Sequence, residues 1–187
     1  LHAEASKWGV QAGFVMDLGE EKALSRLEGD YWNLDSSEDM KELEEMLEYE
    51  KPHLVIASPP CAHPSLLQTL FEEEGNAEAR MHNRDLGLKQ LYAAIRVYRR
   101  QHDMGRCFLH EHPGGTVAEN DPEMDVLRQL DGMQTVYGPM CQWVVKDIEG
   151  HIVKTVHKRL IWVINSKRLA KLLEQLNFHI PAGSLYV

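Results

Sequence analysis

The chain has 187 residues, of which 43% are hydrophobic and 26% are charged, and its formal net charge is −9 at pH 7. This length suits one folded domain that buries about 70% of its unfolded surface, and the composition excludes a disordered or low-complexity chain. No apolar run approaches the roughly 20 residues that a membrane span requires, so no membrane association is expected.

The cysteines and the N-terminus bear on the compartment. Three cysteines, at positions 61, 107 and 141, are an odd number with wide spacing and do not predict a disulfide framework. No apolar signal segment opens the chain, so we expect an intracellular protein, cytoplasmic or nuclear, and not a secreted one. The first residue is Leu rather than Met, which favours a fragment of a longer protein.

The negative charge is spread unevenly. Residues 1–75 carry a net charge of −12, whereas residues 76–187 carry +3. A solvated helix face explains the acidic part most simply. The basic C-terminal third, from Met140 onward, is the part expected to contact a nucleic acid.

The first elements follow from apolar spacing. An apolar run at 13–18 contains Asp17, and a helix is predicted from Ser36 and Ser37 to Tyr49, with apolar residues at helical spacing and Pro52 ending it. The continuous apolar run 53–58 predicts a strand buried on both faces, as in a parallel sheet.

The middle of the chain alternates in the same way. Residues 61–84 lack periodicity and predict a long loop over the site. An amphipathic helix is expected over 85–103, a strand over 107–111 and a short helix over 122–130.

The last third predicts strands over 133–138, 142–146 and 155–165, then a helix capped by Ser166. Alternating strands and helices predict a single α/β domain over residues 1–187. We expect a sandwich with a mostly parallel sheet and helices on both faces, to which the C-terminal strands add antiparallel neighbours.

Three predicted strands end in polar or reactive groups. They are Asp17, the segment Ser58-Pro59-Pro60-Cys61, and the segment His110-Glu111-His112-Pro113. Ligands of open parallel sheets bind beyond the carboxyl ends of the strands. We therefore expect these groups to share one edge of the sheet.

The strand followed by Pro59-Pro60-Cys61 resembles the catalytic loop of cytosine-5 DNA methyltransferases, which have a Rossmann-like fold and use S-adenosylmethionine. The resemblance implies that Cys61 is a nucleophile. A thiolate that adds to carbon 6 of cytosine makes carbon 5 able to attack a sulfonium methyl group, and a thiol is acidic enough for that addition. The alternative is that the prolines only end a strand and that Cys61 is a packing residue.

The segment from Arg106 to Pro113 resembles the strand of the same family that ends in a glutamate binding the flipped cytosine. Glu111 would hydrogen-bond ring nitrogen 3 and the exocyclic amine. Strand alternation then predicts His110 and His112 on the opposite face of the strand.

The resemblance also implies cofactor and target residues. Asp17 would accept hydrogen bonds from the cofactor ribose and Asp35 would lie near the adenine, with Ser58 and Pro59 bordering the cofactor. Arg159, which opens a late strand, would help hold the target base. The match is similar to divergent methyltransferase-like segments of mobile-element polyproteins and spans about residues 1–166. The family's opening Gly-rich loop has no counterpart here, which fits a chain that starts just after it.

Other functions remain open. Cys61, His63, His110 and His112 are metal-ligand types, but their spacings are not those of a structural zinc site, so no metal is predicted. The motif order excludes a zinc deaminase. A cysteine hydrolase lacks any local signature. The main alternative is a non-catalytic binding or scaffolding module with a methyltransferase-like fold.

Overall fold

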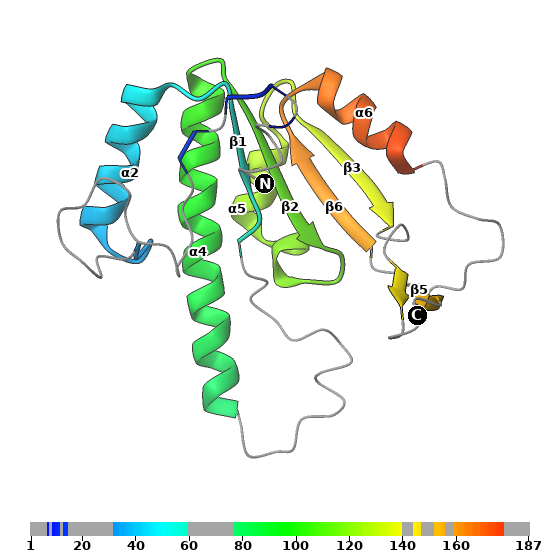
Figure 1. Cartoon of the computed structure of the whole chain (residues 1–187). Coiled ribbons are helices and arrows are strands. Elements are labelled where there is room, and N and C mark those ends of the chain that lie inside the picture. Colours follow the sequence, from blue (N-terminus) through cyan, green and yellow to red (C-terminus); the bar gives the residue numbers. More distant parts are fainter. Residues whose placement is uncertain are drawn as a thin grey trace. The chain divides into compact units, whose positions relative to one another are not determined.

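The computed structural model describes residues 7, 9–11, 13, 14, 32–59, 77–139, 144–146, 152–155 and 159–177 (Figure 1). Two of the predicted site residues, Asp17 and Cys61, lie outside the described residues, as do the apolar run at 13–18 beyond residue 14 and most of the predicted loop. The described chain divides into two compact units, residues 1–53 and residues 54–187. Each unit is described by itself.

The first unit contains helix α2, Ser37–Glu50, which confirms the helix predicted from apolar spacing. The Ser36 side chain caps its amino end by accepting hydrogen bonds from the backbone N–H groups of Glu38 and Asp39. Lys51 ends the helix in the left-handed conformation, with φ 47°. The buried hydrophobic residues of this unit are Trp32, Met40, Leu43 and Leu47.

The second unit is built on a four-stranded sheet with the order β1-β2-β6-β3. Its strands are β1 (Leu54–Ala57), β2 (Cys107–Pro113), β6 (Arg159–Ile164) and β3 (Gln134–Pro139). β1 and β2 pair in parallel, whereas β6 pairs antiparallel with both β2 and β3. Three strands therefore run in one direction and β6 runs against them.

The sheet is thus mixed, and the expectation of a mostly parallel sheet is corrected to a mixed α/β fold. The segments that join consecutive strands explain the directions of these strands. A helix joins β1 to β2 and another joins β2 to β3, and such crossovers let the strands run in parallel. The described residues between β3 and β6 hold no helix, only β4 (Val144–Lys146) and β5 (Ile152–Thr155). β6 returns antiparallel to its neighbours, whereas β3, which was also expected to be an antiparallel addition, runs in the direction of β2.

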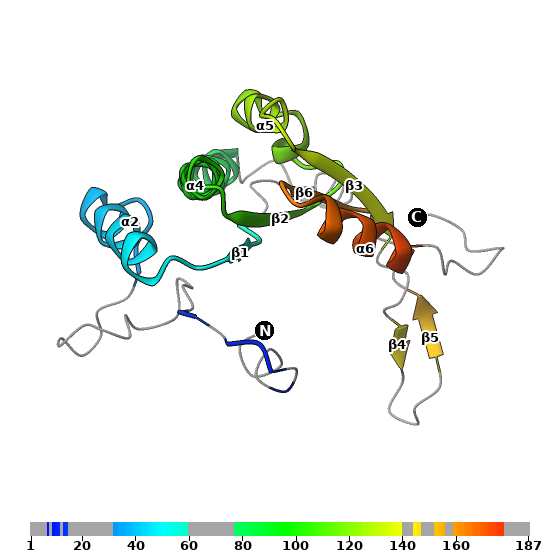
Figure 2. The same cartoon turned by 90° about the horizontal axis from the view of Figure 1, so that it is seen from above.

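Helices pack against both faces of this sheet (Figure 2). On one face, α4 (Ala77–Asp103) and α5 (Pro122–Arg128) enclose a core that includes Tyr98, Phe108 and Val163. On the other face, α6 (Lys167–Asn177) places Ala170 against Val136 and Ile164. A short 3-10 helix, η2 (Val117–Asn120), leads into α5.

Three further predictions about elements are corrected. α4 begins at Ala77 rather than at residue 85, because Ala, Glu and Arg favour helix without making an apolar stripe. Of the strand predicted over 155–165, the structure describes β6 at 159–164, and Thr155 instead ends β5, which pairs with β4 in a sheet of their own. β1 is not buried on both faces, since Ile56 is 49% exposed at the edge of the described four-stranded sheet. Across the described ranges, no helix is long and apolar enough to cross a membrane.

Candidate functional site

Ser58 and Glu111 meet at the carboxyl ends of two neighbouring parallel strands. β1 and β2 pair with Ala57 opposite His110, so the next residues, Ser58 and Glu111, lie side by side. The Ser58 hydroxyl donates a hydrogen bond of 2.5 Å to Glu111 Oε2. The other oxygen, Oε1, accepts no hydrogen bond from the described residues. The two sequence motifs that suggested a function are therefore joined directly at one point.

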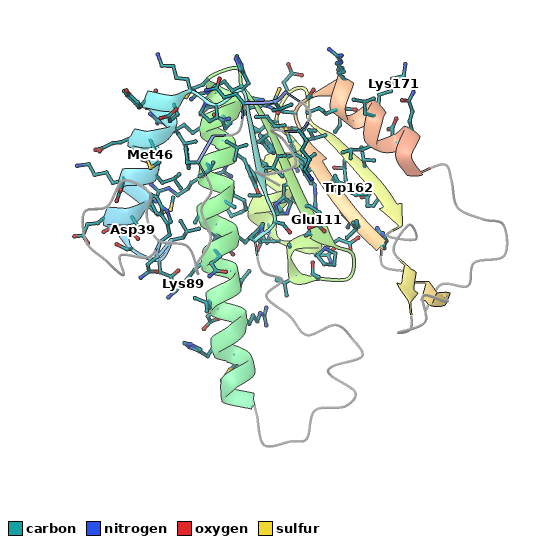
Figure 3. All side chains as sticks on the ribbon, viewed as in Figure 1. Asp39, Met46, Lys89, Glu111, Trp162 and Lys171 are labelled. Atoms are coloured by element: carbon teal, nitrogen blue, oxygen red, sulfur yellow. The ribbon has the colours of Figure 1, made fainter. Side chains whose placement is uncertain are left out.

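The surroundings of Glu111 are partly apolar. Trp162 on β6 lies directly opposite Glu111 in the antiparallel register, on the same face of the sheet (Figure 3). Opposed residues in such a pair have Cβ atoms about 5 Å apart. Trp162 is half-buried and packs toward the core under α6, while Ile56 on β1 is largely exposed. A planar ligand at Glu111 would find a carboxylate beside aromatic and aliphatic surface.

The opposite face of the same strand carries two buried histidines, as strand alternation predicted. His110 is 0% exposed and His112 is 2% exposed, and their ring centroids are 4.9 Å apart. The Tyr98 hydroxyl lies 3.0 Å from His110 Nδ1 and 3.4 Å from the carbonyl oxygen of Ala57. If His110 Nδ1–H donates to the phenol oxygen, the phenol O–H can donate to the Ala57 carbonyl oxygen. Tyr98 of α4 would then link β2 to β1.

Burial keeps both imidazoles neutral. It lowers the pKa of His110 to about 3, helped by His112 and Arg128, and it lowers the pKa of His112 to about 4, helped by Arg128. Among the described residues, His110 Nε2 and both ring nitrogens of His112 have no hydrogen-bond partner. Burial, with the negative charge of Glu111, raises the pKa of Tyr98.

A second group of polar residues lies near the carboxyl end of β2. We call it the Glu119 cluster, and it comprises His112, Gly115, Glu119, Arg128 and Arg159. Glu119 Oε2 accepts a 2.7 Å hydrogen bond from the backbone N–H of Gly115, and Oε1 accepts one of 2.9 Å from Arg159 Nη2. Arg128 Nη1 donates to the Glu119 carbonyl oxygen at 2.7 Å. One carboxylate thus ties a loop to the start of β6.

The structure places Arg159 away from Glu111. Arg159 opens β6 at the same edge of the sheet, but alternation puts its side chain on the His112 face. There the guanidinium pairs with Glu119 and lies 4.9 Å from the ring centroid of Tyr137. The predicted site residues Glu111 and Arg159 therefore share an edge but not a face.

The other predicted residues are distributed as follows. Ser58 is exposed and its hydroxyl is engaged with Glu111, and Pro59, which follows it, is half-buried. Asp35 is exposed in the first unit, in the turn before α2, where its backbone N–H donates to Asn33 Oδ1 at 3.1 Å. Ser58, Pro59 and Glu111 are therefore the predicted site residues that the described structure brings together.

Described cations of the basic C-terminal part lie at both ends of β6. Arg159 opens the strand, and α6 carries the exposed Lys167, Arg168 and Lys171 (Figure 3 labels Lys171). β6 ends at Ile164, which pairs with Leu109 two residues before Glu111, and α6 then packs on the face of the sheet that carries Trp162. Within the described ranges, no three His, Cys, Asp or Glu side chains are grouped so that they could hold a metal ion.

Sequence reasoning missed three contacts that shape the site. Ser58 contacts Glu111, which only the strand register could reveal. The Tyr98 contact with His110 joins a helix to a strand. Glu119 follows Gly114-Gly115, and a carboxylate just after a glycine pair was the signal that could have drawn attention to it. Comparisons with protein-family models, with curated proteins and with solved structures found no match for this chain.

Proposed function

We propose that this protein transfers a methyl group from S-adenosylmethionine to carbon 5 of cytosine in a nucleic acid, most simply DNA. The observation that carries the proposal is the hydrogen bond between Ser58 and Glu111. It joins the segment that resembles the nucleophile loop to the segment that resembles the base-binding strand. The carboxyl ends of parallel strands are also where α/β sheets bind their ligands.

The finer fold assignment belongs to the same proposal. A Rossmann-like methyltransferase sandwich would contain the three co-directional strands β1, β2 and β3, with helices on both faces of the sheet. β6 would then be an antiparallel strand inserted between β2 and β3 of that sheet.

Glu111 would bind the target base. Ser58 donates to Oε2, which holds the carboxylate in one orientation and leaves Oε1 toward a ligand. A carboxylic group in this position can hydrogen-bond ring nitrogen 3 and the exocyclic amine of cytosine. That contact stabilises the protonated ring as the thiolate adds at carbon 6. Trp162, opposite Glu111, would supply apolar surface beside the base.

Cys61 would be the nucleophile. It follows Ser58 by three residues, and three residues of chain span at most about 11 Å. The thiolate would add to carbon 6, and carbon 5 would take the methyl group from the sulfonium, whose thioether leaves. A base, which a water molecule can supply, would then accept the carbon-5 proton, and the thiolate would be expelled. Arg159, which pairs with Glu119, would act on the nucleic acid beside the base rather than on the base itself.

S-adenosylmethionine would supply the methyl group. Of the residues that the resemblance assigns to it, Ser58 contacts the Glu111 carboxylate and Pro59 follows Ser58, so these two fit a methyl donor beside the base. The Ser58 hydroxyl donates to Glu111, so toward a cofactor it could act only as an acceptor.

The proposal can be tested by covalent trapping. In a cytosine that carries fluorine at carbon 5, the position cannot lose a proton after methylation, so the cysteine adduct persists. The protein, incubated with S-adenosylmethionine and a fluorocytosine oligonucleotide, should give an adduct that survives denaturing electrophoresis. Cys61→Ser should give none.

Glu111→Gln should lower methyl transfer by about 10² to 10⁴-fold, the usual range for a proton-transfer group. Glu123→Gln is the matched control, because Glu123 is exposed and pairs only with Arg99 at 2.8 Å. If the wild-type protein forms no adduct and S-adenosylmethionine does not raise its melting temperature, the enzymatic proposal fails. The chain would then be a binding or scaffolding module.

A further inference from the structure

The Glu119 carboxylate is bound as an external anion would be bound. One of its oxygens accepts a backbone N–H from a glycine-rich turn, with Gly115 at φ 78°, and the other accepts a guanidinium N–H from Arg159. Backbone N–H groups of glycine turns and arginine forks are the donors that proteins use for phosphate oxygens. The side chain therefore occupies an anion site made by its own chain.

The cluster offers more donors than Glu119 uses. Arg128 Nε is buried and has no hydrogen-bond partner in the described residues. His112 is 2% exposed, and its neutral ring carries one N–H donor, which has no partner there. The charges of Arg128, Glu119 and Arg159 act on the pKa of this imidazole. Unpaired buried donors cost stability, so native structures rarely keep them without a reason. A ligand with more acceptor oxygens than a carboxylate would satisfy them.

The cluster is also within reach of solvent. The Arg159 side chain is 55% exposed and the Glu119 side chain is 21% exposed. Tyr137, which lies under the guanidinium, is 55% exposed. The Glu119 side chain could therefore swing outward without unfolding the core, and an incoming group could stack on Tyr137 while it reaches Arg159.

The position relative to Glu111 suits one ligand that spans both sites. Gly114 follows Glu111 by three residues and its N–H donates to the Arg159 carbonyl oxygen at 2.8 Å. Three residues of strand cover about 10 Å. Because Glu111 and Arg159 lie on opposite faces of the sheet, a nucleic-acid strand that reaches both would pass around this edge.

We propose that the Glu119 cluster is a binding site for a backbone phosphate of single-stranded nucleic acid, closed in the free protein by the Glu119 side chain. The phosphate displaces Glu119 from Gly115 and Arg159, so Glu119 acts as a latch. The choice of a nucleic acid as the ligand rests on the proposed function. A nucleotide whose base is bound at Glu111 would bring its phosphate backbone close to Glu119.

The test uses the 187-residue chain and a fluorescent oligothymidine, without S-adenosylmethionine. Because this probe contains no cytosine, binding does not depend on methyl transfer, and failure of one proposal does not imply failure of the other. Glu119→Gln should bind the probe about tenfold more tightly than wild type, the gain expected from one charge-assisted hydrogen bond. Glu123→Gln changes the net charge equally and should show little of this gain.

Further variants separate a site from general attraction. Arg159→Gln, added to Glu119→Gln, should remove the gain. Equal affinities for Glu119→Gln and Glu123→Gln would overturn the latch. Inorganic phosphate should displace the probe only weakly. Full displacement at low phosphate concentration would indicate a site for free phosphate and overturn the nucleic-acid assignment.

A structural role alone would give a different result. If Glu119 only braces the loop, its replacement lowers stability and leaves binding unchanged or weaker. Should Glu119→Gln fail to fold, Arg159→Lys in the wild-type background decides the matter, because lysine keeps the charge but loses the planar fork. Arg159→Lys should then weaken probe binding several-fold while Arg99→Lys, in an exposed pair with Glu123, does not. Equal binding by these two variants would refute the proposal.

Discussion

Acid should destabilise this protein through the two buried histidines. The pKa of His110 is lowered to about 3 and that of His112 to about 4, whereas an exposed imidazole titrates near 6.5. Between these values the unfolded chain binds protons that the folded chain does not bind. The free energy of unfolding is therefore fully present above about pH 6.5 and falls as the pH drops toward 4.

The loss of unfolding free energy depends on how far the solution pH lies below the histidine pKa of the unfolded chain, which is about 6.5. At about pH 5, each imidazole should cost about 2 kcal/mol, since one pH unit corresponds to about 1.4 kcal/mol. The pair should cost about 4 kcal/mol relative to pH 7. A loss of that size is a large fraction of the stability of an ordinary domain.

The assay is urea denaturation of the wild type and His112→Leu at both pH values. Leucine leaves no partner unpaired, because neither ring nitrogen of His112 has a hydrogen-bond partner in the described chain. His112→Leu should be no less stable at pH 7, and its loss between pH 7 and pH 5 should be smaller than that of wild type by about 2 kcal/mol.

His82→Gln is the control, because His82 is exposed on α4 and should leave the pH dependence unchanged. If His112→Leu and wild type lose the same free energy of unfolding between pH 7 and pH 5, His112 does not cause the loss. The same conclusion follows if only His82→Gln makes the free energy of unfolding less dependent on pH.

Three further substitutions test local features. Tyr98→Phe removes the hydroxyl that contacts His110 and should lower the free energy of unfolding by about 1–3 kcal/mol in urea; an unchanged midpoint would argue against a structural role for that contact. Lys51→Gly should stabilise α2 by up to about 1 kcal/mol, measured by thermal melting, because glycine adopts the positive φ of this position without strain. Gly114→Ala would place a Cβ 3.0 Å from Cγ and Cδ of Arg159, so the Arg159 side chain must shift. Oligothymidine binding should therefore weaken, while the melting temperature stays within a few degrees. Unchanged binding would show that Arg159 can move aside.

Elements with a clear apolar pattern could be predicted from the sequence. The α2 helix follows from its apolar spacing and its Ser36 cap, and β2 follows from the run that begins at Cys107. Strand direction could not be predicted, because it depends on what connects the strands. The run at 133–138 was recognised as a strand, but nothing local indicates that β6 lies between it and β2.

The candidate site was predictable only in part, for the same reason. Alternation along β2 indicated correctly that His110 and His112 lie away from Glu111. The contact between Ser58 and Glu111 depends on the register of two strands whose residues are 53 positions apart. The pairing of Arg159 with Glu119 joins residues 40 positions apart and gives Arg159 a partner other than the one expected.

The segment from Phe108 to His112 is fixed to the core through the residues that alternate with Glu111. Phe108 stacks on Tyr98 with ring centroids 4.6 Å apart, and His110 contacts the same tyrosine, so alternate residues of β2 are fixed in the core. Glu111, on the other face, needs only the Ser58 hydroxyl to set its orientation. The buried imidazoles cost stability in acid, but they fill the core with rings that hold β2 against α4. A change at His110 should therefore be transmitted to Glu111 through the backbone that they share.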